Sequence, residues 1–110
     1  MSVDLYAKYL KERSGKEIIT NEHGFATYLF EQDYVYLEDV YVEPEHRRSN
    51  ICFSMADEIV EIAKSKGYKK IIGSVVPGTP GATNSLKVLL EYGFKLAYST
   101  ESIIYFQKEI

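Results

Sequence analysis

Apolar and aromatic residues fill the segment from Tyr34 to Val42, with Glu38 and Asp39 as its only charges, and apolar residues then recur at helical spacing from Ile51 to Lys66. The β-branched and aromatic residues of the first segment predict a strand, which ends before Pro44 because proline cannot donate to a strand ladder. The second segment carries an apolar stripe and predicts an amphipathic helix. The stripe consists of Cys52, Met55, Ala56, Ile59, Ile62 and Ala63. The rest of the chain is expected to be arranged around this strand, loop and helix.

The pattern before the central strand predicts one helix and two strands. The helix is expected over Asp4–Arg13, and the strands over Lys16–Thr20 and Phe25–Phe30. The links Asn21–Gly24 and Glu31–Asp33 are short and rich in turn-forming residues. The two strands and the central strand are therefore expected to form an antiparallel meander.

After the long helix, Tyr68–Val76 has the apolar pattern of a buried strand. Strand, helix and strand in this order predict a parallel crossover beside the central strand. A second helix is expected to start at one of the caps in Thr83–Ser85 and to end at Gly93. A last hairpin, with strands Phe94–Tyr98 and Ser102–Phe106, completes a single α/β domain that spans residues 1–110.

Composition narrows the class of protein. The chain has 110 residues, of which 45% are hydrophobic, and a formal net charge of -3, which argues against a nucleic-acid groove. Cys52 is the only cysteine, so no internal disulfide can form. No apolar run reaches the length of a membrane span and no signal peptide is recognised, so a cytoplasmic protein without a membrane partner is expected.

The loop between the central strand and the long helix carries the chemistry that suggests a ligand. Arg47 and Arg48 supply positive charge, and backbone N–H groups from Ser49 to Phe53 are unpaired at a helix start, which favours a phosphate group. Glycine would allow the closest approach, but Asn50 tolerates unusual backbone angles better than most residues. The alternative is that the arginines are solvated charges and Asn50 is a helix cap.

The segment VEPEHRRSNIC resembles the acyl-CoA loop of the GNAT family of N-acetyltransferases. Val42, Pro44 and Arg47 match the family pattern, whereas Asn50 stands in place of a glycine and Cys52 in place of a small residue. The order of elements is similar along nearly the whole chain, and the segment LLEYGFK resembles the family's second helix. The segment LEDVYV looks most like the polyamine and diamine acetyltransferases. The family's first strand is missing here.

This resemblance implies a mixed, mostly antiparallel sheet with a parallel β-α-β crossover at its centre and helices on both faces, lacking the first strand. It implies acetyl-CoA as cosubstrate, with the pantetheine arm bonded to the backbone of the central strand and the phosphates held at the loop. The residues so assigned are Val40, Tyr41, Val42, Arg47, Arg48, Ser49, Asn50, Ile51, Cys52 and Phe53.

The resemblance also implies direct attack of an amine on the thioester, with a small molecule or a protein lysine as acceptor. Glu38 stands where the polyamine branch has a carboxylate acting on the amine, and simple alternation places Asp39 on the opposite face of the strand. The alternative for Glu38 is a solvated charge or one half of an ion pair. Leu89 occupies the family's proton-donating tyrosine position, so Tyr98, or else Tyr105, is the expected substitute.

The departures from the family pattern leave a second hypothesis open, in which the fold has lost its activity and serves as a binding or assembly module. A sheet that lacks an edge strand favours pairing with another copy of the chain. Cys52 is interpreted as a small buried hydrophobe rather than a nucleophile. His23 and His46 are not joined by ligand spacing, so no metal site is expected.

Overall fold

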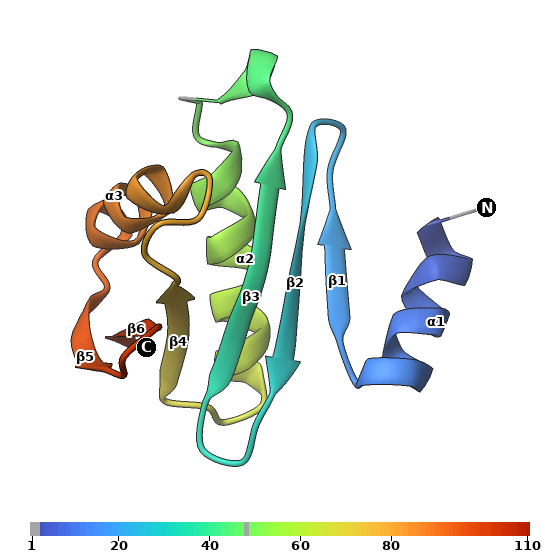
Figure 1. Cartoon of the computed structure of the whole chain (residues 1–110). Coiled ribbons are helices and arrows are strands. Elements are labelled where there is room, and N and C mark those ends of the chain that lie inside the picture. Colours follow the sequence, from blue (N-terminus) through green and yellow to red (C-terminus); the bar gives the residue numbers. More distant parts are fainter. Residues whose placement is uncertain (1–2, 48) are drawn as a thin grey trace.

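The computed structural model describes residues 3–47 and 49–110, which form a mixed sheet with three helices (Figure 1). In chain order the elements are α1 (Val3–Ser14), β1 (Glu17–Thr20), β2 (Gly24–Phe30), β3 (Val35–Val42), the 3₁₀ turn η1 (Pro44–His46), α2 (Ile51–Ser65), β4 (Lys70–Val75), α3 (Ala82–Tyr92), β5 (Lys95–Ser99) and β6 (Ile104–Glu109). No helix among these is long and apolar enough to cross a membrane.

The six strands lie in the order β1-β2-β3-β4-β6-β5. All neighbouring pairs are antiparallel except β3 and β4, which run parallel and are connected through α2. This arrangement confirms the predicted meander, the central β-α-β crossover and the C-terminal hairpin. A right-handed crossover of this kind needs a connection long enough to pack back onto the sheet, which α2 provides.

The ends of several elements differ from the prediction for local reasons. α3 begins at Ala82, before the expected caps, because Gly81 takes the cap position with a φ of 81° that favours glycine. The last strand continues to Glu109 because its backbone pairs with β4 as far as Lys70. The C-terminal end of β6 is therefore set by its pairing with β4, and no turn-forming residue marks it in the sequence.

The core lies between one face of the sheet and two helices. Val35, Ile59 and Ile71, from β3, α2 and β4, are the largest fully buried side chains of the described residues. α2 and α3 lie next to each other, since the rings of Phe53 and Tyr92 are 5.5 Å apart. Of the apolar stripe predicted for the long helix, this packing buries Met55, Ala56, Ile59 and Ala63, whereas Cys52 and Ile62 are half-buried.

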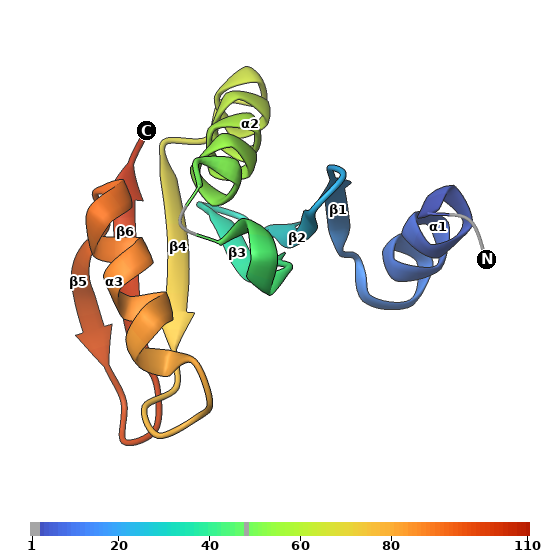
Figure 2. The ribbon, with the colours of Figure 1, turned by 90° about the horizontal axis from the view of Figure 1, so that it is seen from above.

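α1 lies away from this core. The prediction placed helices on both faces, but Figure 2 shows α1 beyond β1, at the edge of the sheet, whereas α2 covers a face. Its Leu10 is buried, but Tyr6 and Tyr9 remain exposed. The face of the central strands opposite α2 therefore carries no helix among the described residues.

A β-bulge in β3 changes which residues share a face. Thr27 pairs with Asp39 and Tyr28 pairs with Leu37, so Glu38 is an extra residue on β3. The prediction that Asp39 lies opposite Glu38 is therefore wrong, because alternation holds only in a regular strand. Both carboxylates lie close enough to Lys16 to raise its pKa.

Candidate functional site

The parallel strands at the centre of the sheet separate after a short paired stretch. β3 and β4 pair only where Val35–Leu37 lies beside Ile71–Gly73. β3 continues to Val42 and β4 continues to Val75, so both strands extend beyond the last paired residues, Leu37 and Gly73. We call the end of this pairing the vertex. From there to Val42, one edge of β3 has no neighbouring strand within the described part of the chain (Figure 1).

The open edge of β3 presents backbone hydrogen-bonding groups. The Glu43 N–H donates to His23 O at 2.8 Å, toward β2. Since successive residues alternate in direction, the backbone groups of Val42 and Val40 point the other way, into the opening. In agreement, Val42 O accepts a 2.8 Å hydrogen bond from Nε of Arg47. The Val40 N–H and C=O and the Val42 N–H are thus available to an extended ligand.

Tyr41, the third residue predicted on this strand, has its backbone turned the other way. A Cβ atom added to Gly24 on β2 would lie only 2.1 Å from Tyr41 O. The backbone of Tyr41 therefore faces the ladder with β2 and not the opening. Its ring faces the loop instead, because the guanidinium of Arg47 lies 5.7 Å from the ring centroid.

The loop that leads into α2 leaves the first amides of the helix uncapped. Asn50 occupies the N-cap position with φ -81° and ψ 9°, and its side chain makes no capping hydrogen bond. The first helical hydrogen bond in this turn runs from Ser54 N–H to Asn50 O. The N–H groups of Ile51, Cys52 and Phe53 therefore precede the helical ladder.

These backbone angles show that Asn50 needs no unusual conformation. A φ of -81° is open to any residue, so the position does not need the left-handed conformation that glycine favours.

The guanidinium of Arg47 donates to Val42 O through Nε. Its other four N–H donors make no hydrogen bond to another described residue, so they remain for an anion. Arg48 lies outside the described residues. The Ser49 hydroxyl donates to His46 O at 2.6 Å, and this hydrogen bond restrains the loop that leads into α2.

Comparison of the sequence with profiles of known families decides the family of this chain. The profile of the Acetyltransferase (GNAT) family matches residues 5–94. The chain belongs to the GNAT family of acetyltransferases.

Solved GNAT proteins share its fold at low sequence identity. PaiA N-acetyltransferase from Thermoplasma acidophilum, in complex with coenzyme A, is 18% identical, with a TM-score of 0.78 over 96% of this chain and 69% of that one. A putative GNAT acetyltransferase from Desulfovibrio desulfuricans is 16% identical, with a TM-score of 0.81 over 96% and 76%. A GNAT acetyltransferase from Elizabethkingia anophelis with acetyl-CoA bound is 17% identical, with a TM-score of 0.71 over 99% and 84%. Comparison with curated proteins gives no match.

Glu38, the predicted catalytic carboxylate of this GNAT domain, follows the vertex directly and is held by an ion pair. Its Oε1 lies 2.8 Å from Nζ of Lys16 and 3.4 Å from the hydroxyl of Thr27. The hydrogen bond that Lys16 donates to Glu38 is the main reason that the pKa of Lys16 is raised. The alternative predicted for Glu38, one half of an ion pair, is therefore present in the structure. The pair also fixes the carboxylate beside the opening.

Tyrosines gather on the face of the sheet that carries no helix. The Tyr36 hydroxyl and Ser74 Oγ are 2.5 Å apart, which bridges β3 and β4 at the vertex. Tyr105 pairs with Ser74 across β4 and β6, and the ring of Tyr98 stacks on that of Tyr105 at 4.6 Å. The pKa of Tyr34 is raised by burial first and then by neighbouring acidic groups that include these phenols.

Tyr36 was not singled out by sequence reasoning, although a signal was present. It alternates with the buried Val35 and Leu37, which places it on the opposite face, one residue before the end of the pairing. Its reach to Ser74 depends on the register of β4, which no local pattern reveals. Tyr98, the predicted proton donor, lies on the outermost strand β5 and is 56% exposed.

Tyr92 and Cys52 carry groups that could react, but both take structural positions. The Tyr92 hydroxyl donates to Asp57 at 2.6 Å. The pKa of Tyr92 is raised far above its ordinary value, mainly by burial and secondly by this hydrogen bond. Tyr92 is therefore a poor acid and faces α2 rather than the vertex. Burial also raises the pKa of the Cys52 thiol, which fits a small hydrophobic residue better than a nucleophile.

Leu89 fills the space behind β4. Its Cδ2 would lie 3.1 Å from a Cβ atom at Gly73, so a side chain at position 73 and Leu89 would compete for the same volume. Leu89 is thus a packing residue, and it brings no proton to the vertex.

Proposed function

We propose that this GNAT domain transfers the acetyl group of acetyl-CoA to an amine by direct attack. The observation that carries the proposal is the opening between β3 and β4. Its edge offers the backbone groups of Val40 and Val42, and its outer end meets Arg47 and the first amides of α2. Related folds with coenzyme A or acetyl-CoA bound support this cosubstrate.

The direction of the bound cosubstrate follows from these positions. Diphosphate suits the N–H groups of Ile51–Phe53 and the guanidinium of Arg47, because a helix N-terminus and a cation both favour negative charge. The amide-containing pantetheine arm would then run back along β3, bonding to the free groups of Val40 and Val42. This route brings the thioester to the vertex, between Glu38 and Tyr36.

The chemistry at the vertex needs a proton acceptor for the amine and a proton for the departing sulfur. Glu38 first takes a proton from the ammonium group, directly or through a water molecule, which frees the nitrogen lone pair to bond to the thioester carbon. The nitrogen then loses a second proton to solvent as the C–S bond breaks. Tyr36 is the phenol nearest to the vertex in the sheet and is placed to protonate the thiolate. Tyr98, or else Tyr105, remains the donor proposed from the sequence, and the rings of these two residues stack on each other.

A cationic amine is the acceptor that suits the helix-free face. Four tyrosines, Tyr34, Tyr36, Tyr98 and Tyr105, offer π faces that attract ammonium groups. Glu38 and Asp39 add negative charge on the same face as Lys16. Both a polyamine and a protein lysine have this chemistry, so the proposed acceptor class is a primary amine that carries positive charge.

Binding of acetyl-CoA tests the proposal. Acetyl-CoA at millimolar concentration is expected to raise the midpoint of thermal unfolding, because a ligand that binds only the folded chain stabilises it. Titration calorimetry would then give the dissociation constant. If acetyl-CoA at this concentration gave no thermal shift and no heat of binding, the cofactor site would be rejected.

Arg47→Ala should weaken acetyl-CoA binding about tenfold, the effect of losing one charge-assisted hydrogen bond worth about 1.4 kcal/mol. Arg13→Ala is a matched control. Arg13 also lies over a tyrosine ring, 5.8 Å from that of Tyr9, but on α1, far from the opening. If Arg47→Ala and Arg13→Ala bound acetyl-CoA with equal affinity, Arg47 would not contact the phosphates of the cosubstrate.

A second candidate function is a binding or assembly module without turnover. It is favoured by the ion pair that occupies Glu38 and by Leu89 at the family's tyrosine position. The two functions are separated by release of free coenzyme A thiol when acetyl-CoA is incubated with a panel of polyamines and lysine peptides. Thiol release that depends on the amine supports the enzyme, and tight binding without release supports the module.

A further inference from the structure

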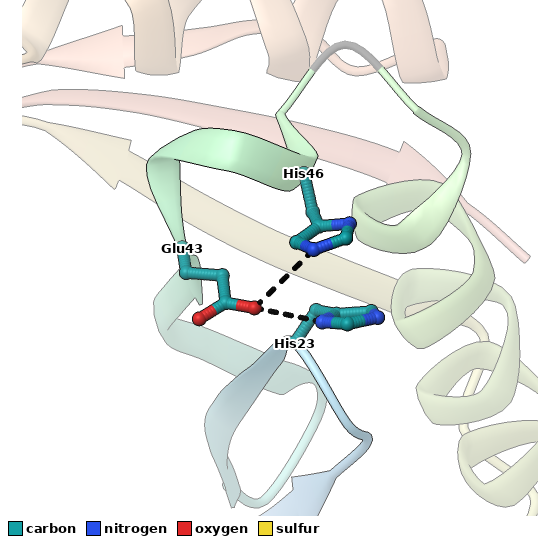
Figure 3. A group of neighbouring side chains, drawn as sticks. All are labelled: His23, Glu43 and His46. Carbon is teal, nitrogen blue, oxygen red and sulfur yellow. Dashed lines mark hydrogen bonds and ion pairs between the residues drawn. The ribbon is translucent and has the colours of Figure 1, made fainter.

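A cluster of His23, Glu43 and His46 lies at the outer end of β3, next to the loop that leads into α2 (Figure 3). His23 belongs to the turn between β1 and β2, whereas Glu43 and His46 belong to the 3₁₀ turn that follows β3. The sequence indicated no link between the two histidines. The fold brings their rings into a stack, with centroids 3.5 Å apart and planes 15° from parallel.

The potential ligand atoms converge on one small volume. Nδ1 of His23 lies 2.7 Å from Oε1 of Glu43, and Nε2 of His46 lies 3.5 Å from the same oxygen. All three ligand atoms lie within 4.8 Å of one another. Tetrahedral zinc with bonds of about 2.0–2.2 Å holds its ligand atoms about 3.3–3.6 Å apart. The pair Glu43–His46 already has this separation, and the pair His23–Glu43 must lengthen slightly.

The backbone holds all three residues in place without help from a ligand. The His23 N–H donates to Oδ1 of Asn21 at 2.7 Å, and His23 O accepts from the Glu43 N–H at 2.8 Å. The His46 N–H donates to Glu43 O at 2.9 Å, and residues three apart in a 3₁₀ turn are eclipsed. Ligand binding would therefore order side chains only, which lowers its entropic cost.

The stack sets one requirement for metal binding. A metal ion lies in the plane of each imidazole that binds it, and the lone pairs of stacked rings run parallel. One ring must therefore turn about its side-chain torsions before both nitrogens can reach the same ion. The side chains of His23 and His46 are 32% and 42% exposed, which leaves room for this rotation.

We propose that His23, Glu43 and His46 bind one divalent transition-metal ion of the zinc class, with water in the fourth position. Two imidazoles favour zinc, cobalt, nickel or copper over magnesium and calcium, which prefer oxygen ligands. The bound ion would join the turn between β1 and β2 to the segment that leads to Arg47. This site is separate from the proposed acetyl-CoA contacts, since none of its three ligand side chains belongs to them.

Titration calorimetry of the full-length chain with Zn²⁺ alone tests the site. The wild type is expected to bind one ion per chain. His23→Gln, Glu43→Gln and His46→Gln should each weaken binding at least about tenfold, since even outer-shell changes have effects of this size. Glu45→Gln is the matched control, because it removes the same charge from an exposed residue of the same turn that lies outside the cluster.

Co²⁺ provides an independent readout, because visible absorption bands report a low-symmetry site. The bands should appear in the wild type and in Glu45→Gln and be lost in His46→Gln. Circular dichroism of each variant without metal would show that the fold is retained. Equal Zn²⁺ affinity of all four variants and the wild type would mean an adventitious ion only and would overturn the proposal, as would no binding by the wild type. Neither measurement uses acetyl-CoA, so its result is independent of the acetyltransferase proposal.

Discussion

At the scale of single residues, Glu38 shows how one inserted position builds a site. The extra residue in β3 shifts the alternation, so that Val35 and Leu37 face the core before it and Val42 faces the core after it. The bulge places Glu38 next to the end of the strand pairing and within 2.8 Å of Lys16. The carboxylate thus has two possible roles, holding the N-terminal segment and accepting a proton. These roles predict different results on mutation.

Glu38→Gln should lower kcat by about 10²-fold and leave the KM for acetyl-CoA nearly unchanged, because general-base catalysis contributes about 10²–10⁴-fold and Glu38 does not hold the cosubstrate. Steady-state assays of thiol release would measure both constants.

Lys16→Met separates the two roles of Glu38. It breaks the same ion pair but leaves the carboxylate, so it should change the urea midpoint much as Glu38→Gln does, with far less effect on kcat. A kcat that falls equally in both variants would show that Glu38 acts only by holding Lys16.

At the scale of elements, the pairing of β2 with β3 supports the whole site. Gly24 begins β2 opposite Val42, and it fits because its position has no Cβ atom to meet Tyr41 O. The ladder formed there turns the backbone of Val40 and Val42 toward the opening. The same contact aligns the turn that carries His23 with Glu43. Both proposed sites therefore depend on this glycine.

Gly24→Ala should lower the free energy of unfolding by about 1–3 kcal/mol, because the added Cβ atom would force the two strands apart. Urea denaturation followed by circular dichroism measures this change.

Gly15→Ala is a useful comparison. Its φ of 69° strains alanine, but nothing lies within 4 Å of the added atom, so only the conformational cost of about 1–2 kcal/mol applies and the proposed sites should be unaffected. Weaker acetyl-CoA binding in Gly24→Ala alone would show that strand pairing aligns the opening.

At the scale of the whole molecule, the chain has a main core and a peripheral helix. The core joins β2, β3, β4, β6, α2 and α3, whereas α1 contacts the sheet at its edge beside β1. Tyr6 and Tyr9 of α1 are 40% and 53% exposed. Segments with little buried surface open at lower free energy than the core. The molecule is therefore expected to lose structure in stages under native conditions.

Amides of α1 should exchange with deuterium at least about tenfold faster than those of β4 and the C-terminal half of α2, because α1 can open without disturbing the core. Hydrogen-exchange mass spectrometry with peptide resolution would measure this difference. Equal protection of α1 and β4 at low protein concentration would contradict it. Protection of α1 that grows with protein concentration would instead support the predicted pairing of two copies.

The sequence by itself determined the elements, their order and the nature of the loop before α2. Periodicity marks β3 and α2, because strands and helices each repeat at a characteristic local spacing, and Arg47 and Pro44 stand in that loop whatever the rest of the chain does. The same local signals were enough to indicate the family to which the chain belongs.

Only the tertiary structure decided which distant residues meet. The bulge at Glu38 and the contact of Tyr36 with Ser74 depend on strand register, and a register is set by the packing of whole strands rather than by any one segment. The stack of His23 on His46 likewise exists because two turns, far apart in the chain, are joined by the ladder between β2 and β3. The spacing of residues along the chain does not reveal contacts of this kind. For that reason the opening between β3 and β4 and the cluster of His23, Glu43 and His46 are seen only in the folded molecule.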